Sequence, residues 1–286
     1  MNRRLLKELL TSSRPISWIN TAFPFAAGYI LITRTLDMPL IVGSLYFLIP
    51  YNLMMYGVND VFDYESDLRN PRKGGIEGAV LSPDLHKPIL IAVVLTNAPF
   101  LVALSMIGSV AAKLTLAFVV FMVIAYSVAK LRFKERPLLD SITSSTHFVG
   151  PLVYALVLTG WHAAYLWYVV PFFLWGMASH AFGAVQDILS DRAAKIASIA
   201  TYFGARRTTR FACSLYLLCA AILASQGIKG LVVGLCAVLY ATTVARYWNI
   251  TDKTSETAHN GWSRFLRLNQ FSGFVITLVL IATIRG

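Results

Sequence analysis

The chain has 286 residues, of which 57% are hydrophobic and only 14% are charged, and its formal net charge is +11. So much apolar surface with so little charge excludes a soluble globular protein and is typical of an integral membrane protein. Apolar runs close to the roughly 20 residues that cross a bilayer recur along the whole length. We expect nine membrane-spanning helices, at about 15–33, 39–58, 88–108, 113–130, 140–160, 164–186, 209–226, 229–246 and 269–284.

The predicted fold is all-α, a single bundle of nine transmembrane helices, with residues 1–286 forming one domain. The short connections at 34–38, 109–112, 161–163 and 227–228 indicate helical hairpins. The N-terminal segment MNRRLLKELLTSSRP is basic and amphipathic, which favours an interfacial helix over a signal peptide. Cys213, Cys219 and Cys236 lack ligand spacing and are expected to pack as small apolar residues inside spans.

The basic residues predict the orientation of the chain. With the N-terminus in the cytoplasm, the cytoplasmic segments are 1–14, 59–88, 130–140, 187–210 and 246–268. These contain every Lys and Arg except Arg34, Lys113, Lys229 and Arg285. The positive-inside rule favours this topology, which places the C-terminus on the opposite side. We therefore expect a multi-pass protein of the cell membrane whose partners are the bilayer and an anionic substrate, not nucleic acid.

An acidic stretch, NDVFDYESD, runs from Asn59 to Asp67 at the end of the second predicted span. If the helix continues, each residue turns by about 100°, so Asn59, Asp60, Asp63 and Asp67 share one face and Glu65 points away. Neighbouring carboxylates ~5–6 Å apart repel by roughly 3 kcal/mol at an effective dielectric of ~20. Solvation of a helix end does not require that repulsion. A hard divalent cation relieves it, because such ions bind carboxylate and amide oxygens.

A second acidic pair lies in HAFGAVQDILSDRAAK, where Asp187 and Asp191 are four residues apart at the end of the sixth span. Alone, the pair could be an ordinary helix end. Two such faces at one membrane depth, on one side, favour Mg²⁺ held between them. Because Mg²⁺ usually keeps water and takes substrate phosphate oxygens, the predicted missing ligand is a diphosphate.

Basic residues flank both acidic stretches. RNPRKGG brings Arg69, Arg72 and Lys73 directly after the first, and Arg192 and Lys195 follow the second. The segment YSVAKLRFKERP, from Tyr126 to Pro137, adds four more basic residues. Each alone could be a positive-inside or snorkelling residue, but their crowding indicates an anion. We predict diphosphate contacts for Asn59, Arg72, Lys73, Lys130, Arg132 and Lys134.

These motifs resemble those of the UbiA-type membrane prenyltransferases. NDVFDYESD matches the family's N-D-x-x-D-x-x-x-D motif, and DILSD with the downstream SIATYFG is similar to its second Asp motif. The likeness covers nearly the whole chain, although Lys195 and Ser198 stand where many members have Gly and Thr. The resemblance implies that the Mg²⁺–diphosphate residues are Asn59, Asp63, Asp67, Asp187 and Asp191, supported by Asp60. The resemblance then implies that the catalytic acids are Asp63, Asp67, Asp187 and Asp191.

The resemblance also implies a reaction. An allylic diphosphate ionises, pyrophosphate leaves, and the cation is shielded from water until an acceptor attacks it. NPRKGGIEGAVL and SHAFGAVQDILSDRAAKIASIAT look most like the lycopene elongase branch, which implies a dimethylallyl donor, lycopene as acceptor and a role in carotenoid biosynthesis. An aromatic-acceptor prenyltransferase of quinone or haem biosynthesis is the alternative. A cation-coupled transporter is disfavoured, because the acids lie at helix ends rather than at the membrane midplane. A small membrane-protein partner is left open.

Three further side chains are candidates for the reaction. His180 lies seven residues before Asp187, within about 20° on the same helix face and roughly 10 Å deeper. It could accept the proton lost after coupling or hold the water that quenches the cation. The alternative is a buried histidine bonded to a neighbouring helix. Tyr56 and Tyr126 could face the allylic cation, with packing or an interfacial role as the alternative.

Overall fold

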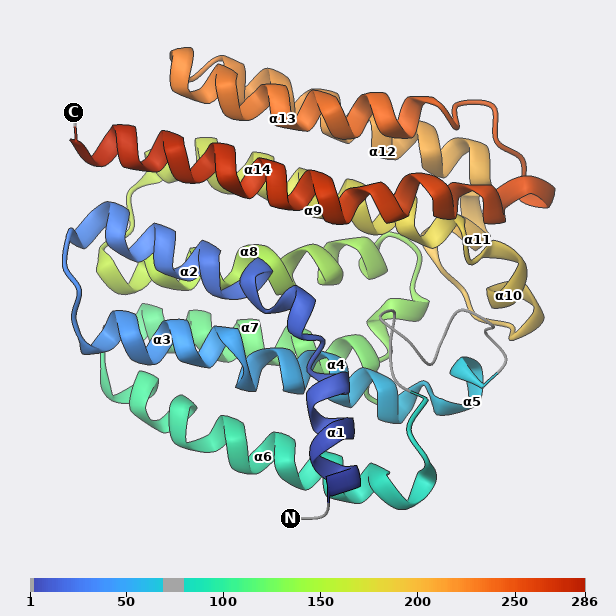
Figure 1. Ribbon diagram of the computed structural model, residues 1–286, viewed down its shortest axis with the longest axis horizontal. Helices are drawn as coiled ribbons and strands as arrows, with labels where there is room; N and C mark the ends of the chain where they lie inside the picture. The colour runs from blue at the N-terminus through green and yellow to red at the C-terminus, as the bar shows by residue number, and fades with distance from the viewer. Residues whose placement is uncertain (1–2, 69–79, 286) are drawn as a thin grey trace. The chain divides into compact units, whose positions relative to one another are not determined.

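The computed structural model describes residues 3–68 and 80–285. Throughout these ranges the regular elements are helices and none is a strand. Within them, nine helical segments are long and apolar enough to cross a membrane, so the predicted all-α fold and its nine spans are confirmed. The chain divides into two compact units (Figure 1): unit 1 is Met1–Phe133 and His147–Trp161, and unit 2 is Lys134–Thr146 and His162–Gly286.

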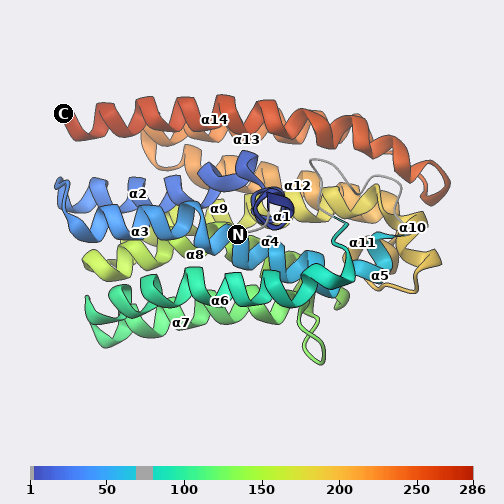
Figure 2. The same ribbon diagram turned by 60° about the horizontal axis from the view of Figure 1, so that its bottom comes forward.

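Unit 1 is built around α4, which packs against α1, α3, α6 and α7 (Figure 2). Its helices are α1 (Arg3–Ser12), η1 (Pro15–Ser17), α2 (Trp18–Thr33), α3 (Met38–Leu48), α4 (Pro50–Phe62), α5 (Tyr64–Asp67), α6 (Pro83–Met106) and α7 (Val110–Ser127). The rings of Phe25, Phe47, Tyr51 and Tyr154 are fully buried and in contact, and they form the aromatic centre of its core. This packing fixes α4, whose C-terminal end carries the first acidic motif.

The second predicted span is broken within its length. Pro50 separates α3 from α4, because proline has no N–H to donate and its ring clashes with the carbonyl four residues earlier. The side-chain amide of Asn52 repairs the break by donating to the carbonyl oxygens of Phe47 (2.9 Å) and Leu48 (3.1 Å). The two helices therefore behave as one apolar segment, Met38–Phe62.

The N-terminal segment forms α1, as its amphipathic pattern predicts. Leu9 packs against the core of unit 1, whereas Leu6 and Leu10 are half exposed, which suits a helix lying in a membrane interface. The helix ends at Ser12, and Arg14 takes a left-handed backbone (φ 49°) before η1. This turn directs the chain into α2.

Unit 2 is centred on α12, which packs against α9 and α13, while α13 packs against α14. Helix α8 (Leu139–Thr159) begins in unit 2 and ends in unit 1. The helices of unit 2 that follow it are η3 (Ala163–Tyr165), α9 (Leu166–Val185), α10 (Ile188–Ala193), α11 (Ile199–Phe203), α12 (Ala205–Ala224), α13 (Gly227–Ala245), η4 (Asp252–Ala258) and α14 (His259–Arg285). The remaining 3-10 turn, η2 (Phe133–Glu135), spans the boundary between the two units in the sequence. Phe182, Tyr216, Tyr240 and Phe265 form the core.

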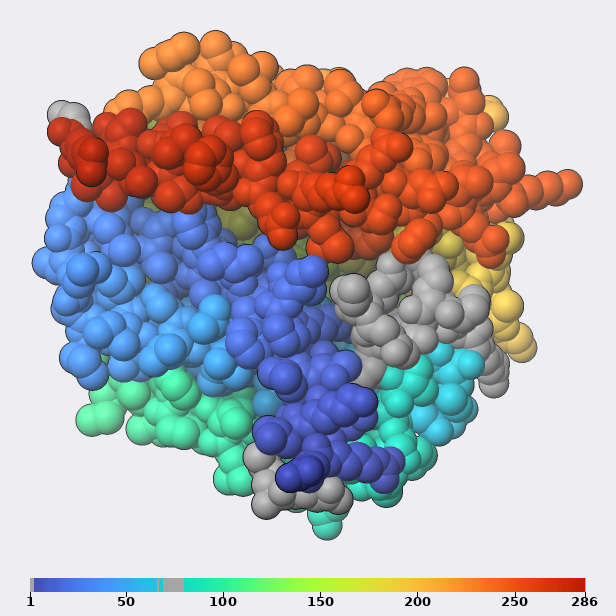
Figure 3. Space-filling model, viewed as in Figure 1, coloured from blue at the N-terminus to red at the C-terminus, as the bar shows by residue number. Residues whose placement is uncertain are grey.

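Helix α14 begins ten residues earlier than the predicted span 269–284 and lies open on the viewed face of unit 2 (Figure 3). Phe271, Phe274 and Leu278 project from it with half or more of their surface exposed, as lipid-facing side chains do. The three cysteines are buried and free of disulfides, which agrees with their predicted packing role.

Candidate active site

The first acidic motif lies where α4 ends. The predicted continuous helix is wrong in this detail: α4 stops at Phe62, and Asp63 has non-helical angles (φ −101°, ψ 0°) before α5 begins. Carboxylates near a helix C-terminus oppose the helix dipole, which favours such a break. Backbone hydrogen bonds from Asp63 N–H to Asn59 (2.9 Å) and from Asp67 N–H to Asp63 (2.8 Å) still keep the three residues on successive turns. Asp63 and Asp67 are buried and Glu65 is exposed, as predicted.

The side chain of Asn59 orients Asp63. Its amide nitrogen donates to Asp63 Oδ2 at 2.7 Å and to the hydroxyl oxygen of Ser127 at 3.1 Å. Ser127 is fully buried at the end of α7, so it anchors the amide to a second helix. The amide therefore fixes one carboxylate oxygen of Asp63 before any ligand binds.

Arg132 is the predicted diphosphate residue that the structure places beside the first motif. Its guanidinium lies 3.7 Å from Asp63 Oδ1 and donates to the Phe62 carbonyl at 3.4 Å. Lys130 and Arg132 both have left-handed backbones, φ 75° and 38°, which turn the chain sharply after α7. Lys130 is exposed, and Lys134 lies in η2, in unit 2. Arg69, Arg72 and Lys73 lie outside the described residues.

Asp60, which we expected to support the metal, has a protein partner that the sequence did not reveal. Its Oδ1 is 3.0 Å from a guanidinium nitrogen of Arg14, and its side chain is 0% exposed. The Arg14 guanidinium lies 4.1 Å from the centre of the Tyr56 ring. Tyr56 thus has the packing role considered as its alternative. Asp60, four residues after Tyr56 in α4, holds the turn after α1 to the first motif, and a metal role for Asp60 stays a prediction.

The second acidic motif begins where α9 ends. The predicted end of this span, residue 186, is confirmed to within one residue. Asp187 has angles of φ −94° and ψ −3°, and the backbone N–H of Asp191 bonds to its carbonyl at 2.8 Å. Both aspartates are half-buried. This motif lies in unit 2 and the first in unit 1, and their predicted pairing on one metal ion stays a prediction.

Helix α10 ends in a Schellman motif. The N–H of Lys195 bonds to the Arg192 carbonyl (3.1 Å), and the N–H of Ile196 bonds to the Asp191 carbonyl (2.8 Å). Lys195 itself is left-handed (φ 58°), a conformation that glycine adopts at lower cost. Glycine would therefore fit the backbone at position 195 better than lysine does.

His180 is bonded to a neighbouring helix. Its Nδ1 lies 3.0 Å from the hydroxyl oxygen of Ser141, a fully buried residue in the first turn of α8. The structural alternative for His180 is confirmed, and its catalytic role stays a prediction. Tyr126, the other aromatic candidate, packs edge-on against the ring of His147 at 5.1 Å.

Sequence reasoning missed Asp140, which precedes Ser141. Its side chain is 0% exposed and accepts two backbone N–H bonds at 2.6 Å, from Ser141 and from Ile199. The second bond ties the segment after the second motif to the start of α8. An acid at the beginning of an apolar span was the available signal, because a charge there needs a partner.

The donor atoms at the two motifs suit a hard cation. They are carboxylate oxygens of aspartates with one amide, and Mg²⁺ takes such oxygens together with water and substrate phosphates. Across residues 3–68 and 80–285, no three His, Cys, Asp or Glu side chains form a ready-made metal-binding group. Which residues hold Mg²⁺ stays a prediction, and the predicted set is Asn59, Asp60, Asp63 and Asp67 in unit 1 and Asp187 and Asp191 in unit 2.

A model of the UbiA prenyltransferase family matches residues 21–270, from α2 into α14 and through both acidic motifs. The chain belongs to the UbiA prenyltransferase family. It is therefore an enzyme, a prenyltransferase of UbiA type, and the nine long apolar helices within its described residues indicate a multi-pass membrane protein.

Relatives of the chain are similar over 79% to 97% of its length. A lycopene elongase/hydratase of Corynebacterium glutamicum is 50% identical over 279 residues, 97% of both chains. The C(50) beta-cyclic carotenoids biosynthesis protein LbtBC of a Dietzia species is 48% identical, over 97% of this chain and 65% of that one. A lycopene elongase/hydratase of Halobacterium salinarum is 32% identical, over 79% of this chain and 82% of its own.

Solved UbiA structures share the fold. A UbiA homolog from Archaeoglobus fulgidus, bound to DMAPP and Mg²⁺, matches with a TM-score of 0.69 at 18% identity, over 94% of this chain and 99% of that one. A digeranylgeranylglyceryl phosphate synthase matches with a TM-score of 0.68 at 15% identity, over 99% and 100%. At these identities the likeness establishes the architecture of this UbiA chain and not its substrates.

Proposed function

We propose that this prenyltransferase transfers a dimethylallyl group from its diphosphate to the ends of lycopene, with Mg²⁺ as cofactor. The observation that carries the proposal is the 50% identity to a lycopene elongase/hydratase over 97% of both chains. Two further relatives of the same name, at 32% and 33% identity, support it. A UbiA homolog with this fold binds DMAPP and Mg²⁺, which supports the donor and the cofactor.

The proposed reaction breaks the C–O bond of the allylic diphosphate and forms one C–C bond. Pyrophosphate leaves with the bonding electrons, and the terminal alkene of lycopene attacks the allylic cation. The resulting tertiary cation then loses a proton or captures water, which releases a proton. The hydratase in the relatives' names supports the capture of water.

Residues of this chain divide the work. Mg²⁺, when bound, would neutralise charge on the leaving diphosphate. Asp63, pre-oriented by Asn59, and Asp67 present carboxylates from unit 1, while Arg132 adds a fixed positive charge next to Asp63. Asp187 and Asp191 present carboxylates from unit 2. We propose that both motifs serve the same step, so that residues 1–286 act as one functional domain.

The proposed location is the cell membrane, with the acidic motifs on the cytoplasmic side. The distribution of Lys and Arg supports this orientation, since all but Arg34, Lys113, Lys229 and Arg285 fall in the segments placed in the cytoplasm. The proposed donor is an anionic, water-soluble diphosphate, which would then reach the motifs from the cytoplasm. Lycopene would enter from the bilayer.

The decisive experiment expresses the chain in lycopene-producing bacteria and measures the masses of the pigments. Products one and two five-carbon units heavier than lycopene support the proposal, and added water increases those masses further. Unaltered lycopene, together with prenylation of an aromatic quinone or haem precursor by purified protein, would overturn the lycopene assignment. With purified protein and lycopene, geranyl and farnesyl diphosphate should be much poorer donors than dimethylallyl diphosphate.

Two variants test the role of the motifs. Asp63→Ala and Asp187→Ala should each abolish pyrophosphate release while the protein still inserts in the membrane. Glu65→Ala is the matched control, because Glu65 is an acid of the same motif whose side chain is exposed. Undiminished release in either aspartate variant, or a severe loss with Glu65→Ala, would contradict the assignment.

A further inference from the structure

The α13–α14 connection, defined as residues 246–259 so that it includes His259, the first residue of α14, contacts both flanks of the second acidic motif. Gln186 directly precedes Asp187, and its Oε1 lies 2.8 Å from Nδ1 of His259. Arg192 directly follows Asp191, and its guanidinium lies 2.7 Å from Asp252 Oδ2. We name the pair His259–Gln186 the inner tether and the pair Asp252–Arg192 the outer tether. Both reach the motif from a segment more than 50 positions further along the chain.

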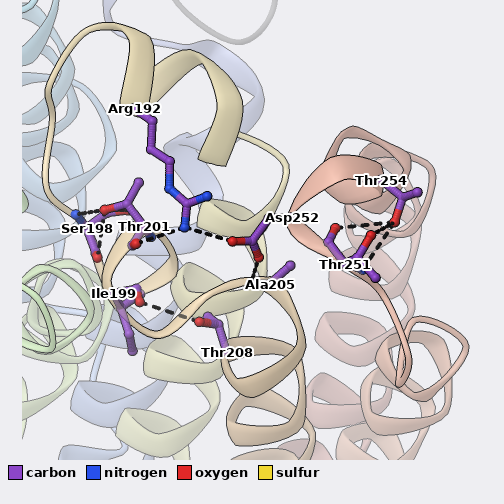
Figure 4. Close-up of polar contacts among 9 residues, drawn as sticks. All are labelled: Arg192, Ser198, Ile199, Thr201, Ala205, Thr208, Thr251, Asp252 and Thr254. Atoms are coloured by element: carbon purple, nitrogen blue, oxygen red, sulfur yellow. Dashed lines mark hydrogen bonds and ion pairs between the residues drawn. The ribbon is translucent and has the colours of Figure 1, made fainter.

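The outer tether joins several elements at one carboxylate. Besides Arg192, Asp252 accepts the backbone N–H of Ala205, the first residue of α12, at 2.7 Å. The guanidinium of Arg192 also donates to the Thr201 carbonyl of α11 at 3.2 Å. Figure 4 shows Arg192 extending from α10 toward both partners. Because the ion pair is substantially exposed, its electrostatic contribution to stability is small, and its effect is to fix where α10 lies.

The inner tether acts on a buried group. Gln186 is only 7% exposed, and a buried amide left without a partner is costly, so His259 fixes its side chain. Gln186 directly follows Val185, the last residue of α9, and immediately precedes the turn of the backbone at Asp187. The two tethers therefore hold the motif at the residues directly before and after it, in a region where the helix is interrupted.

We infer that the α13–α14 connection is a positioning device for the second motif. It fixes the backbone that carries Asp187 and Asp191, so the affinity for Mg²⁺–diphosphate depends on Asp252 and His259, neither of which is a predicted ligand. The inference rests on the proposed role of Asp187 and Asp191 in binding Mg²⁺–diphosphate. Asp252 and His259 belong neither to the predicted metal residues nor to the predicted diphosphate residues.

The test uses full-length protein purified in detergent and two readouts. Hydrogen exchange of the amides in residues 188–198, without substrate, reports the backbone of the motif. A Mg²⁺ titration of pyrophosphate release reports its function. His259→Leu removes the inner tether, whereas His259→Asn keeps an amide nitrogen near the position of Nδ1. Asp252→Asn removes the charge of the outer tether and keeps an acceptor for the Ala205 N–H.

We expect each tether-breaking variant, His259→Leu or Asp252→Asn, to raise the half-saturating Mg²⁺ concentration by roughly fivefold, and the double variant by more than tenfold. The rate at saturating Mg²⁺ should stay within about twofold, since the tethers position the carboxylates and do not touch substrate. Exchange in 188–198 should accelerate in the same order. His259→Asn should remain close to the unmodified protein in both readouts.

Arg210→Ala is the matched control. Arg210 binds the same connection, at the Trp248 carbonyl and the Asn249 side chain (3.3 Å each), but joins it to α12 rather than to the motif. Exchange and Mg²⁺ dependence should be unchanged in this variant. Equal loosening by Arg210→Ala, or unchanged exchange in the tether variants, would overturn the inference. If the unmodified protein released no pyrophosphate, the proposed function would fail, and exchange alone would still decide about the tethers.

Discussion

The guanidinium of Arg14 lies 3.0 Å from the carboxylate of Asp60, which joins the turn after α1 to the first acidic motif. The pair is largely buried, with side-chain exposures of 17% and 0%. Removal of one partner of a buried ion pair leaves the other charge uncompensated, at a cost of about 3 kcal/mol. Arg14→Gln should therefore lower the thermal unfolding temperature in detergent, and Arg14→Gln with Asp60→Asn should recover much of the loss.

An equivalent pair on the surface provides the control for that prediction. Arg4 and Asp84 are also 3.0 Å apart, but more than half of each side chain is exposed. Exposed ion pairs contribute little, so Arg4→Gln should leave the unfolding temperature nearly unchanged. Equal effects of Arg4→Gln and Arg14→Gln would show that burial of the Arg14–Asp60 pair is not what matters.

The bond between Asn59 and Ser127 predicts a kinetic effect. Ser127→Ala removes one acceptor of the Asn59 amide, so the amide should orient Asp63 less firmly. We expect the KM for the donor diphosphate to rise by about two- to tenfold, the equivalent of one neutral hydrogen bond, at normal protein abundance. Ser105→Ala is the control, because among the described residues the exposed Ser105 donates within α6, to the Val102 carbonyl. A KM shift with Ser105→Ala, or none with Ser127→Ala, would contradict the prediction.

The bond between His180 and Ser141 predicts how His180→Phe behaves. The substitution leaves the buried Ser141 hydroxyl without this partner. The variant should therefore lose about 1 kcal/mol of unfolding free energy and unfold at a lower temperature. Adding Ser141→Ala should relieve part of the cost. We expect an unchanged ratio of hydrated to dehydrated carotenoid. A changed ratio at normal abundance would instead make His180 the group that accepts the proton or holds the water.

The left-handed backbone at Lys195 predicts a stabilising substitution. Lys195→Gly should raise the unfolding free energy by about 1 kcal/mol, since glycine avoids the steric cost of this conformation in a Schellman motif. Lys195→Ala keeps the strain while removing the charge, and it should not stabilise. Thermal unfolding of the two variants side by side measures the difference. If alanine stabilised as much as glycine, the gain would come from charge and not from backbone.

The length of the apolar runs predicted the spans, because a bilayer is the main environment in which an apolar segment of about 20 residues is stable. It located the end of α9 to within one residue, and helical periodicity separated the buried Asp63 and Asp67 from the exposed Glu65. Neither pattern found the partner of Asp60, because Arg14 is 46 positions away and only packing brings the two together. For the same reason the tether residues Asp252 and His259 carried no signal in the sequence.

The break of the helix at Asp63 was also missed, because propensity alone does not decide between a continuous helix and a one-residue interruption. Asp63 and Asp187 nevertheless have nearly the same backbone angles, φ −101° and ψ 0° against φ −94° and ψ −3°. Each follows an apolar helix, and each accepts at 2.8 Å the N–H of the aspartate four residues later. One copy lies in each compact unit. The chain thus carries one local structure twice, the trace that duplication of an ancestral segment would leave after FDYESD and QDILSD had diverged.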